Sequence, residues 1–69
     1  SFIADIERHG EVHATFEGVD GEVECRLGTT HVDFRKDIIE VFDGDQFHSY
    51  SANHLITWQV PMNIYESND

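Results

Sequence analysis

Hydrophobic and polar residues alternate along most of this 69-residue chain, and turn residues interrupt the alternation repeatedly. A period of two is typical of β-strands with one buried face, because successive side chains of a strand point to opposite sides. The alternation predicts short strands over residues 2–7, 12–17, 22–27, 31–34 and 47–50. Residues 38–42 are apolar at four of five positions, which predicts a strand covered on both faces. Asp20-Gly21 is the strongest turn signal between them, since both residues tolerate the positive φ that a hairpin turn needs.

The segment after residue 50 has two interpretations. Residues 51–54 are predicted to form a single helical turn, with Ser51 available as its N-cap. Residues 55–60 contain Ile, Thr, Trp and Val, which favour a strand that Pro61 would end. A helix over residues 52–60 is the alternative, because several of its apolar residues would share one helical face.

Together these elements predict an all-β fold. It is a single domain over residues 1–69, built as a meander of five to seven short antiparallel strands, with residues 66–69 frayed. Its second half has a strand pair joined by Asp-Gly-Asp, one turn over residues 51–54 and a last strand. This order resembles the end of SH3-like and Sm-like small barrels, where a short 3₁₀ turn separates the last two strands. The resemblance covers residues 38–60 and implies an SH3-like, partly open barrel with few exposed strand edges.

Two features of Sm proteins have no predicted counterpart in this chain. The alternation over residues 2–7 predicts a strand, so no amino-terminal helix is expected. The Asn and Arg-Gly elements with which Sm proteins hold uridines cannot be matched to this sequence either. The resemblance therefore implies the fold and not RNA binding.

Length and cysteine content limit how the chain can be stabilised. A chain this short buries only about 60% of its unfolded surface, so its core must be small and rich in aromatic side chains. Five Phe, two Tyr and one Trp are available for it. Cys25 is the single cysteine and excludes a disulfide within one chain. A lone cysteine, together with the lack of an apolar run of about 20 residues, favours a soluble, cytoplasmic protein without a membrane span.

Charge is the strongest compositional signal. The chain has 14 Asp and Glu against 4 Lys and Arg, which gives a formal net charge of −10, and only Lys36 is a lysine. Such a composition resembles that of the cytoplasmic proteins of halophilic archaea, whose carboxylates stay hydrated while molar salt screens their repulsion. An acidic mimic of DNA is the alternative interpretation. The same charge argues against binding of nucleic acid through phosphate contacts.

Candidate chemistry is sparse. His9 and His13 are four residues apart, which fits the spacing of zinc ligands, and His48 and His54 are further weak candidates. These pairs complete no metal motif, so we predict no metal and no cofactor. Motifs of nucleophilic, phosphate-binding and zinc-dependent enzymes are lacking, and Cys25 occupies an apolar strand face where a thiol is inert. We therefore predict no catalytic residues, no enzymatic activity and no small-molecule substrate.

An apolar stretch near the carboxyl terminus is the remaining candidate site. It comprises Trp58, Val60, Met62, Ile64 and Tyr65. Met and aromatic residues are enriched at interfaces, and the competing interpretation is that the stretch folds back onto the core. We predict a small acidic protein of a halophile that binds a protein partner or itself as an interaction or regulatory module. The alternative is a nucleic-acid-related protein, either an RNA-binding small barrel or a DNA mimic.

Overall fold

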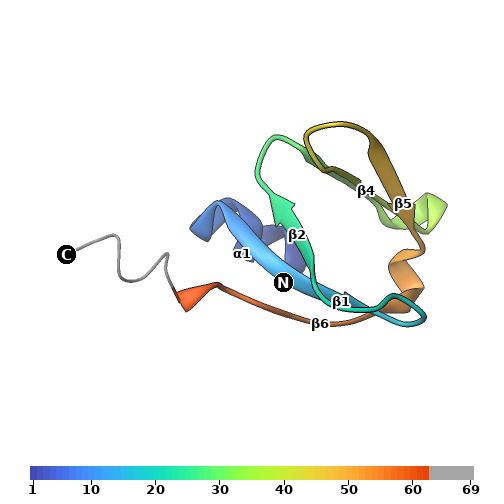
Figure 1. The fold of residues 1–69 in the computed structure, drawn as a ribbon, viewed down its shortest axis with the longest axis horizontal. Coiled ribbons are helices and arrows are strands. Elements are labelled where there is room, and N and C mark those ends of the chain that lie inside the picture. Colours follow the sequence, from blue (N-terminus) through green and yellow to red (C-terminus); the bar gives the residue numbers. More distant parts are fainter. Residues whose placement is uncertain (63–69) are drawn as a thin grey trace.

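Two three-stranded antiparallel sheets form the body of the protein in the computed structural model, which describes residues 1–62 (Figure 1). The elements, in chain order, are α1 (Phe2–His9), β1 (Glu11–Phe16), β2 (Val23–Arg26), β3 (Thr30–Asp33), the 3₁₀ helix η1 (Phe34–Lys36), β4 (Ile38–Phe42), β5 (Phe47–Tyr50), the 3₁₀ helix η2 (Ala52–His54) and β6 (Leu55–Gln59). One sheet has the strand order β2-β1-β6 and the other β3-β4-β5. The prediction of a largely antiparallel β meander is confirmed, although the described chain also contains one α-helix.

The largest error of the sequence prediction lies at the amino terminus, where residues 2–7 belong to α1 instead of a strand. Phe2 and Ile6 are four residues apart, so a helix buries both on one face, and a short alternating segment cannot distinguish the two cases. Ser1 caps the helix, since its hydroxyl accepts a hydrogen bond from a backbone N–H of the first turn. Gly10 ends it with a φ of 81°, in the left-handed region that glycine tolerates. The expectation that the chain lacks an amino-terminal helix is therefore wrong.

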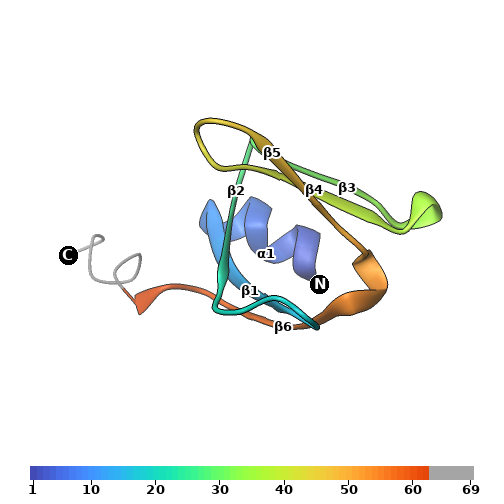
Figure 2. The same cartoon turned by 45° about the vertical axis from the view of Figure 1, so that its right-hand side comes forward.

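A bend at residues 27–29 carries the chain from one sheet to the other. Before the bend β2 pairs with β1, and after it β3 pairs with β4. Figure 2 shows the two sheets facing each other, with α1 near β1. They do not close into a barrel, and β2 and β5 each end a sheet.

The core lies between the two sheets and α1. Its buried side chains are Phe2, Ile6, Val12, Ala14, Phe16, Cys25, Ile39 and Val41. Phe16 stacks on Tyr50 with ring centroids 4.5 Å apart, which joins β1 to β5. Trp58 meets Phe2 edge to face at 5.4 Å, and its Nε1 donates to Asp5 Oδ2 at 2.8 Å. These contacts fix α1 against β6 and lower the pKa of the Asp5 carboxyl, chiefly through the hydrogen bond from the indole.

Asp37 connects the two 3₁₀ helices. It ends η1 with a φ of 55°, and its carboxylate accepts hydrogen bonds from Ser51 Oγ and from Asn53 N, the latter at 2.8 Å. These two bonds, the serine bond first, lower the pKa of the Asp37 carboxyl. The predicted helical turn over residues 51–54 is confirmed as η2, but Ser51 does not cap it with its side chain, because the hydroxyl donates to Asp37.

The strand β6 decides between the two interpretations of residues 52–60. It pairs with β1, placing Gln59 opposite His13 and Trp58 opposite Ala14. A helix over these residues would have left the backbone groups on that edge of the buried strand β1 without partners. The pairing with β1, which is distant in sequence, therefore determines the outcome.

Candidate interaction surfaces

The predicted carboxy-terminal surface is divided in the structure. Trp58 and Val60 are half-buried and pack against the core, as the competing interpretation of this stretch expects. Met62 is 73% exposed. Ile64 and Tyr65 lie outside the described residues. Met62 is therefore the exposed member of the predicted surface among residues 1–62.

A wider uncharged region includes this stretch. Residues 46–65 contain no Asp, Glu, Lys or Arg, and this is the longest such segment in a chain of which charged types make up 26%. The segment includes β5, η2 and β6. Phe47 on β5 is 59% exposed and Ile56 on β6 is 63% exposed. The absence of charge is visible in the sequence and could have extended the predicted surface toward residue 46.

The strands β5 and β6 each end a sheet, and we call their outer sides, with Phe47 and Ile56, the uncharged edges. Asp43 N donates to Gln46 O at 3.1 Å at the start of the β4–β5 pair. Because bonding alternates in an antiparallel pair, the main-chain groups of Phe47 and Ser49 point away from β4. Outward main-chain groups on an end strand can pair with a strand of another chain.

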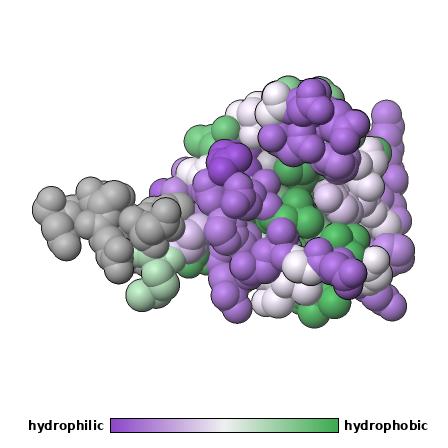
Figure 3. Space-filling view, viewed as in Figure 1, coloured by the Kyte–Doolittle hydropathy of each residue, from purple (hydrophilic) through white to green (hydrophobic). Residues whose placement is uncertain are grey.

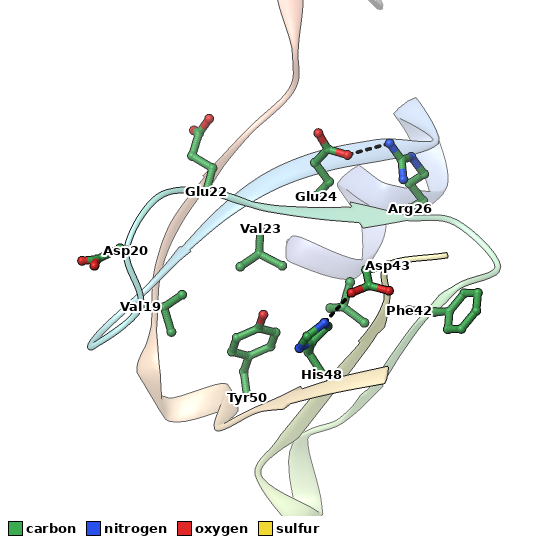
Figure 4. A pocket seen from close by; sticks show the side chains of 11 residues that line it. Val19, Asp20, Glu22, Val23, Glu24, Arg26, Phe42, Asp43, His48 and Tyr50 are labelled. Atoms are coloured by element: carbon green, nitrogen blue, oxygen red, sulfur yellow. Dashed lines mark hydrogen bonds and ion pairs between the residues drawn. The ribbon is translucent and has the colours of Figure 1, made fainter. Parts of the chain in front are cut away.

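A cavity of about 350 Å³ opens between β2 and the β4–β5 hairpin (Figure 4). Val19, Val23 and Tyr50 point into it and form an apolar floor, and Figure 3 shows hydrophobic surface between hydrophilic borders on this face. We call the cavity and its borders the acidic groove. Its borders carry the charged and titratable side chains Asp20, Glu22, Glu24, Arg26, Asp43 and His48.

Arg26 organises the β2 side of the acidic groove. Its Nε lies 3.0 Å from Glu11 Oε1 on β1, and its Nη2 lies 2.6 Å from Glu24 Oε2. Glu11 Oε2 is also 2.6 Å from His13 Nε2, and this hydrogen bond, ahead of the arginine, holds the pKa of Glu11 below its usual value. Glu22 stands at the groove border with a half-exposed side chain, 3.7 Å from His13 Nδ1.

Asp43 organises the opposite border. Its carboxylate accepts hydrogen bonds from Gln46 N and Asp45 N, both at 2.8 Å, and lies 2.6 Å from His48 Nε2. Hydrogen bonds that favour the ionised form lower the pKa of Asp43 to about 2, with Gln46 N the largest contributor, then His48 and Asp45 N. Asp43 is thus a fixed negative charge at neutral pH.

The histidines and the cysteine do not assemble a chemical centre in residues 1–62. His13 and His48 each lie beside a carboxylate, His9 ends α1 and His54 lies in η2. No group of three His, Cys, Asp or Glu side chains within these residues could hold a metal ion. Cys25 is buried, as predicted for its inward position, and desolvation, followed by the nearby Glu11 charge, raises its pKa to about 11. Such a thiol is a poor nucleophile.

The basic residues do not gather into one patch. Arg26 borders the acidic groove, whereas Arg35 and Lys36 lie in η1. Asp33 accepts hydrogen bonds from the N–H groups of these two residues, which turns the chain into a 3₁₀ helix. Phe34 is therefore 59% exposed at the start of η1, and the expectation that it continues a strand is wrong.

Comparisons of this chain with protein-family models, with curated proteins and with solved structures gave no match. Within residues 1–62, no helix combines the length and the apolar character that crossing a bilayer requires.

Proposed function

We propose that this protein is an interaction module that associates with copies of itself through its uncharged edges. The observation that carries the proposal is that two end strands, β5 and β6, lie in the one long segment without charged residues and expose Phe47 and Ile56. Interface centres are depleted of charged side chains and enriched in aromatic ones. A free strand edge also supplies main-chain hydrogen bonds to a partner strand.

The proposed contact joins unlike edges. Pairing β5 of one copy with β6 of the next is a head-to-tail contact, which closes into a ring if the rotation between copies permits. Each copy carries a formal charge of −10, so association needs salt to screen the repulsion. High salt also strengthens the burial of apolar surface. This fits the proposal that the protein works in the salt-rich cytoplasm of a halophile.

We also propose that the fold is of the SH3-like or Sm-like class. The element order supports an SH3-like or Sm-like architecture, because the chain turns at residues 27–29 from one sheet into the other and a last strand follows a 3₁₀ turn to pair with β1. The amino-terminal helix α1 removes one of the two differences from Sm proteins that the sequence suggested. The lack of their uridine-binding elements remains.

Sedimentation velocity in about 1 M salt, where the Debye length is near 3 Å, tests the self-association. The wild type should sediment as an oligomer. Ile56→Lys should weaken association roughly 30-fold or more, because it places a charge in the centre of the contact. The matched control is Leu27→Lys, since Leu27 is 57% exposed at the bend between the sheets and should tolerate lysine. A monomeric wild type, or equal loss in both variants, would contradict the proposal.

Single-stranded nucleic acid is the second candidate ligand, favoured by the exposed Phe34 beside Arg35 and Lys36 in η1. Stacking of one base on an aromatic ring contributes about 1–3 kcal/mol and survives salt better than phosphate contacts do. Fluorescence anisotropy with a labelled single-stranded RNA should then detect binding that Phe34→Ala weakens and Phe47→Ala does not. Equal binding by both variants would exclude η1 as the binding site.

A further inference from the structure

The acidic groove shares β5 with one of the uncharged edges, through His48 and Tyr50, but differs from both edges in charge. It lies between β2, which ends the first sheet, and the strands β4 and β5 of the second sheet (Figure 4). Its volume of about 350 Å³ lies within the range of about 300 to 1,000 Å³ found for ligand sites. From this geometry we propose that the groove binds an extended segment of a partner protein with alternating apolar and basic residues, which adds to β2 as a further strand.

The main chain of β2 is directed to accept such a strand. Leu27 N donates to Gly10 O at 2.9 Å, which sets the bonding pattern of the β1–β2 pair. By the alternation of antiparallel bonding, the main-chain groups of Val23 and Cys25 face β1, and those of Glu24 and Arg26 face the groove. The strand order places no strand of residues 1–62 on that side of β2. An added strand would lie about 4.8 Å from β2 and pair with these groups.

The side chains of β2 explain why the partner segment should alternate apolar and basic residues. Val23 points into the cavity toward Tyr50, whereas Glu22 and Glu24 stand on the other side of the strand (Figure 4). Residues of an added strand that face inward would therefore cover the apolar floor formed by Val19, Val23 and Tyr50. The residues between them would lie beside Glu22 and Glu24, where opposite charges across strands are favourable and like charges are not.

The negative charge of the groove borders favours a positively charged partner segment. The groove borders carry four carboxylates against Arg26, and Arg26 already pairs with Glu24 and with Glu11. A second copy of this chain would bring a further formal charge of −10, and a nucleic acid would bring phosphates, so both would be repelled. A basic peptide is attracted, and the attraction also speeds its encounter with the groove.

The test uses a blocked synthetic peptide of about six alternating lysine and valine residues, a common strand length. Binding is followed by NMR on the isotope-labelled full chain, in the most dilute buffer that preserves its folded spectrum. The amide signals of Glu24 and Arg26 should shift on titration. The double variant Glu22→Gln/Glu24→Gln should bind on the order of tenfold more weakly, since it removes two partly exposed ion pairs.

Two controls separate groove binding from general attraction to an acidic protein. Glu7→Gln/Glu17→Gln removes the same charge from exposed positions outside the groove and should leave the affinity within about twofold of wild type. Arg26→Gln should bind the peptide more tightly, because it frees the carboxylate of Glu24. Folding of every variant is checked from its own spectrum.

Several results would overturn the inference. These are no shift at Glu24 and Arg26, equal weakening by the two double variants, or equal binding of a peptide of alternating glutamate and valine. Concentration-dependent shifts of the same amides without peptide would identify a second copy as the occupant and overturn it as well. Because self-association is measured at the uncharged edges by sedimentation, failure of either proposal leaves the other intact.

Discussion

The uncharged edges and the acidic groove are both places where a sheet ends, yet they differ completely in charge. The edges of β5 and β6 expose Phe47 and Ile56 in a segment without charged residues. The groove beside the free side of β2 is bordered by four carboxylates. An open strand edge supplies the same main-chain hydrogen bonds in both places, so the side chains around it determine which partner can approach.

Salt should therefore distinguish the two surfaces. Screening weakens attraction between a carboxylate border and a basic peptide, whereas it removes the repulsion between acidic copies. The protein would then have one surface that works best in concentrated salt and one that works best in dilute salt.

The largest expected effect comes from Phe16→Ala, because Phe16 is buried and its stack on Tyr50 joins the two sheets that carry both surfaces. Deletion of a buried phenylalanine ring costs about 3–5 kcal/mol. Urea denaturation should show a loss of this size, and both self-association and peptide binding should fail together. Ile39→Val, at another buried position, should cost only about 0.5–1.5 kcal/mol and keep both activities. If Phe16→Ala abolished one activity and spared the other, the stack would not couple the two surfaces.

The next effect is that of salt on the wild type. Raising salt from about 0.15 M to about 1 M shortens the Debye length from about 8 Å to about 3 Å. Peptide binding should weaken on the order of tenfold, as expected for screening of two exposed ion pairs. Self-association should strengthen over the same range, measured by sedimentation. A change of both in the same direction would mean that charge does not distinguish the two surfaces.

A smaller effect is expected from pH at the groove border. The pKa of Asp43 is lowered to about 2 in the folded protein, so its carboxylate stabilises the fold fully above the ordinary aspartate pKa near 4. That contribution is lost as the pH falls from about 4 to about 2. The urea midpoint of the wild type should therefore exceed that of Asp43→Asn at pH 6, and the difference should shrink steadily toward pH 2. A difference independent of pH would show that the charge of Asp43 plays no part.

The smallest expected signal is the reaction of Cys25 with thiol reagents. With a pKa raised to about 11, only about one thiol in a thousand is ionised at pH 8, and the side chain is buried on the inner face of β2. Labelling of the native protein should be slow and limited by opening of the structure, and urea should make it fast. Rapid labelling without denaturant would show that β2 detaches readily, which would weaken the case for a preformed groove.

The sequence predicted the elements whose signals are local. Alternation identified the strands that became β1, β2 and β5, a nearly continuous apolar run identified β4, and Asp20-Gly21 marks the turn before β2. The prediction of a strand over residues 2–7 was wrong, because Phe2 and Ile6 fit one face of a helix as well as an alternating pattern. The caps Ser1 and Gly10 favour the helix. The sequence shows a serine and a glycine at these positions, but it does not show the hydrogen bonds by which they cap a helix.

The candidate surfaces depend on contacts between distant residues and were harder to predict. The sequence left open whether Trp58 belongs to an interaction surface or packs onto the core. Its indole bonds to Asp5, which only the position of α1 makes possible. The acidic groove brings together residues from 19 to 50 where β2 approaches the β4–β5 hairpin, and no sequence spacing encodes that approach. The absence of charge over residues 46–65, together with the Met and aromatic residues within it, is a local signal that points to an interface.

The most direct test of the central claim is amide hydrogen exchange of Phe47 and Ser49 in about 1 M salt, compared between the wild type and Ile56→Lys. These amides point away from β4, so within one copy they have no strand partner among residues 1–62. Protection in the wild type that disappears in Ile56→Lys would establish that β5 of one copy pairs with β6 of another. Equally fast exchange in both proteins would contradict the account.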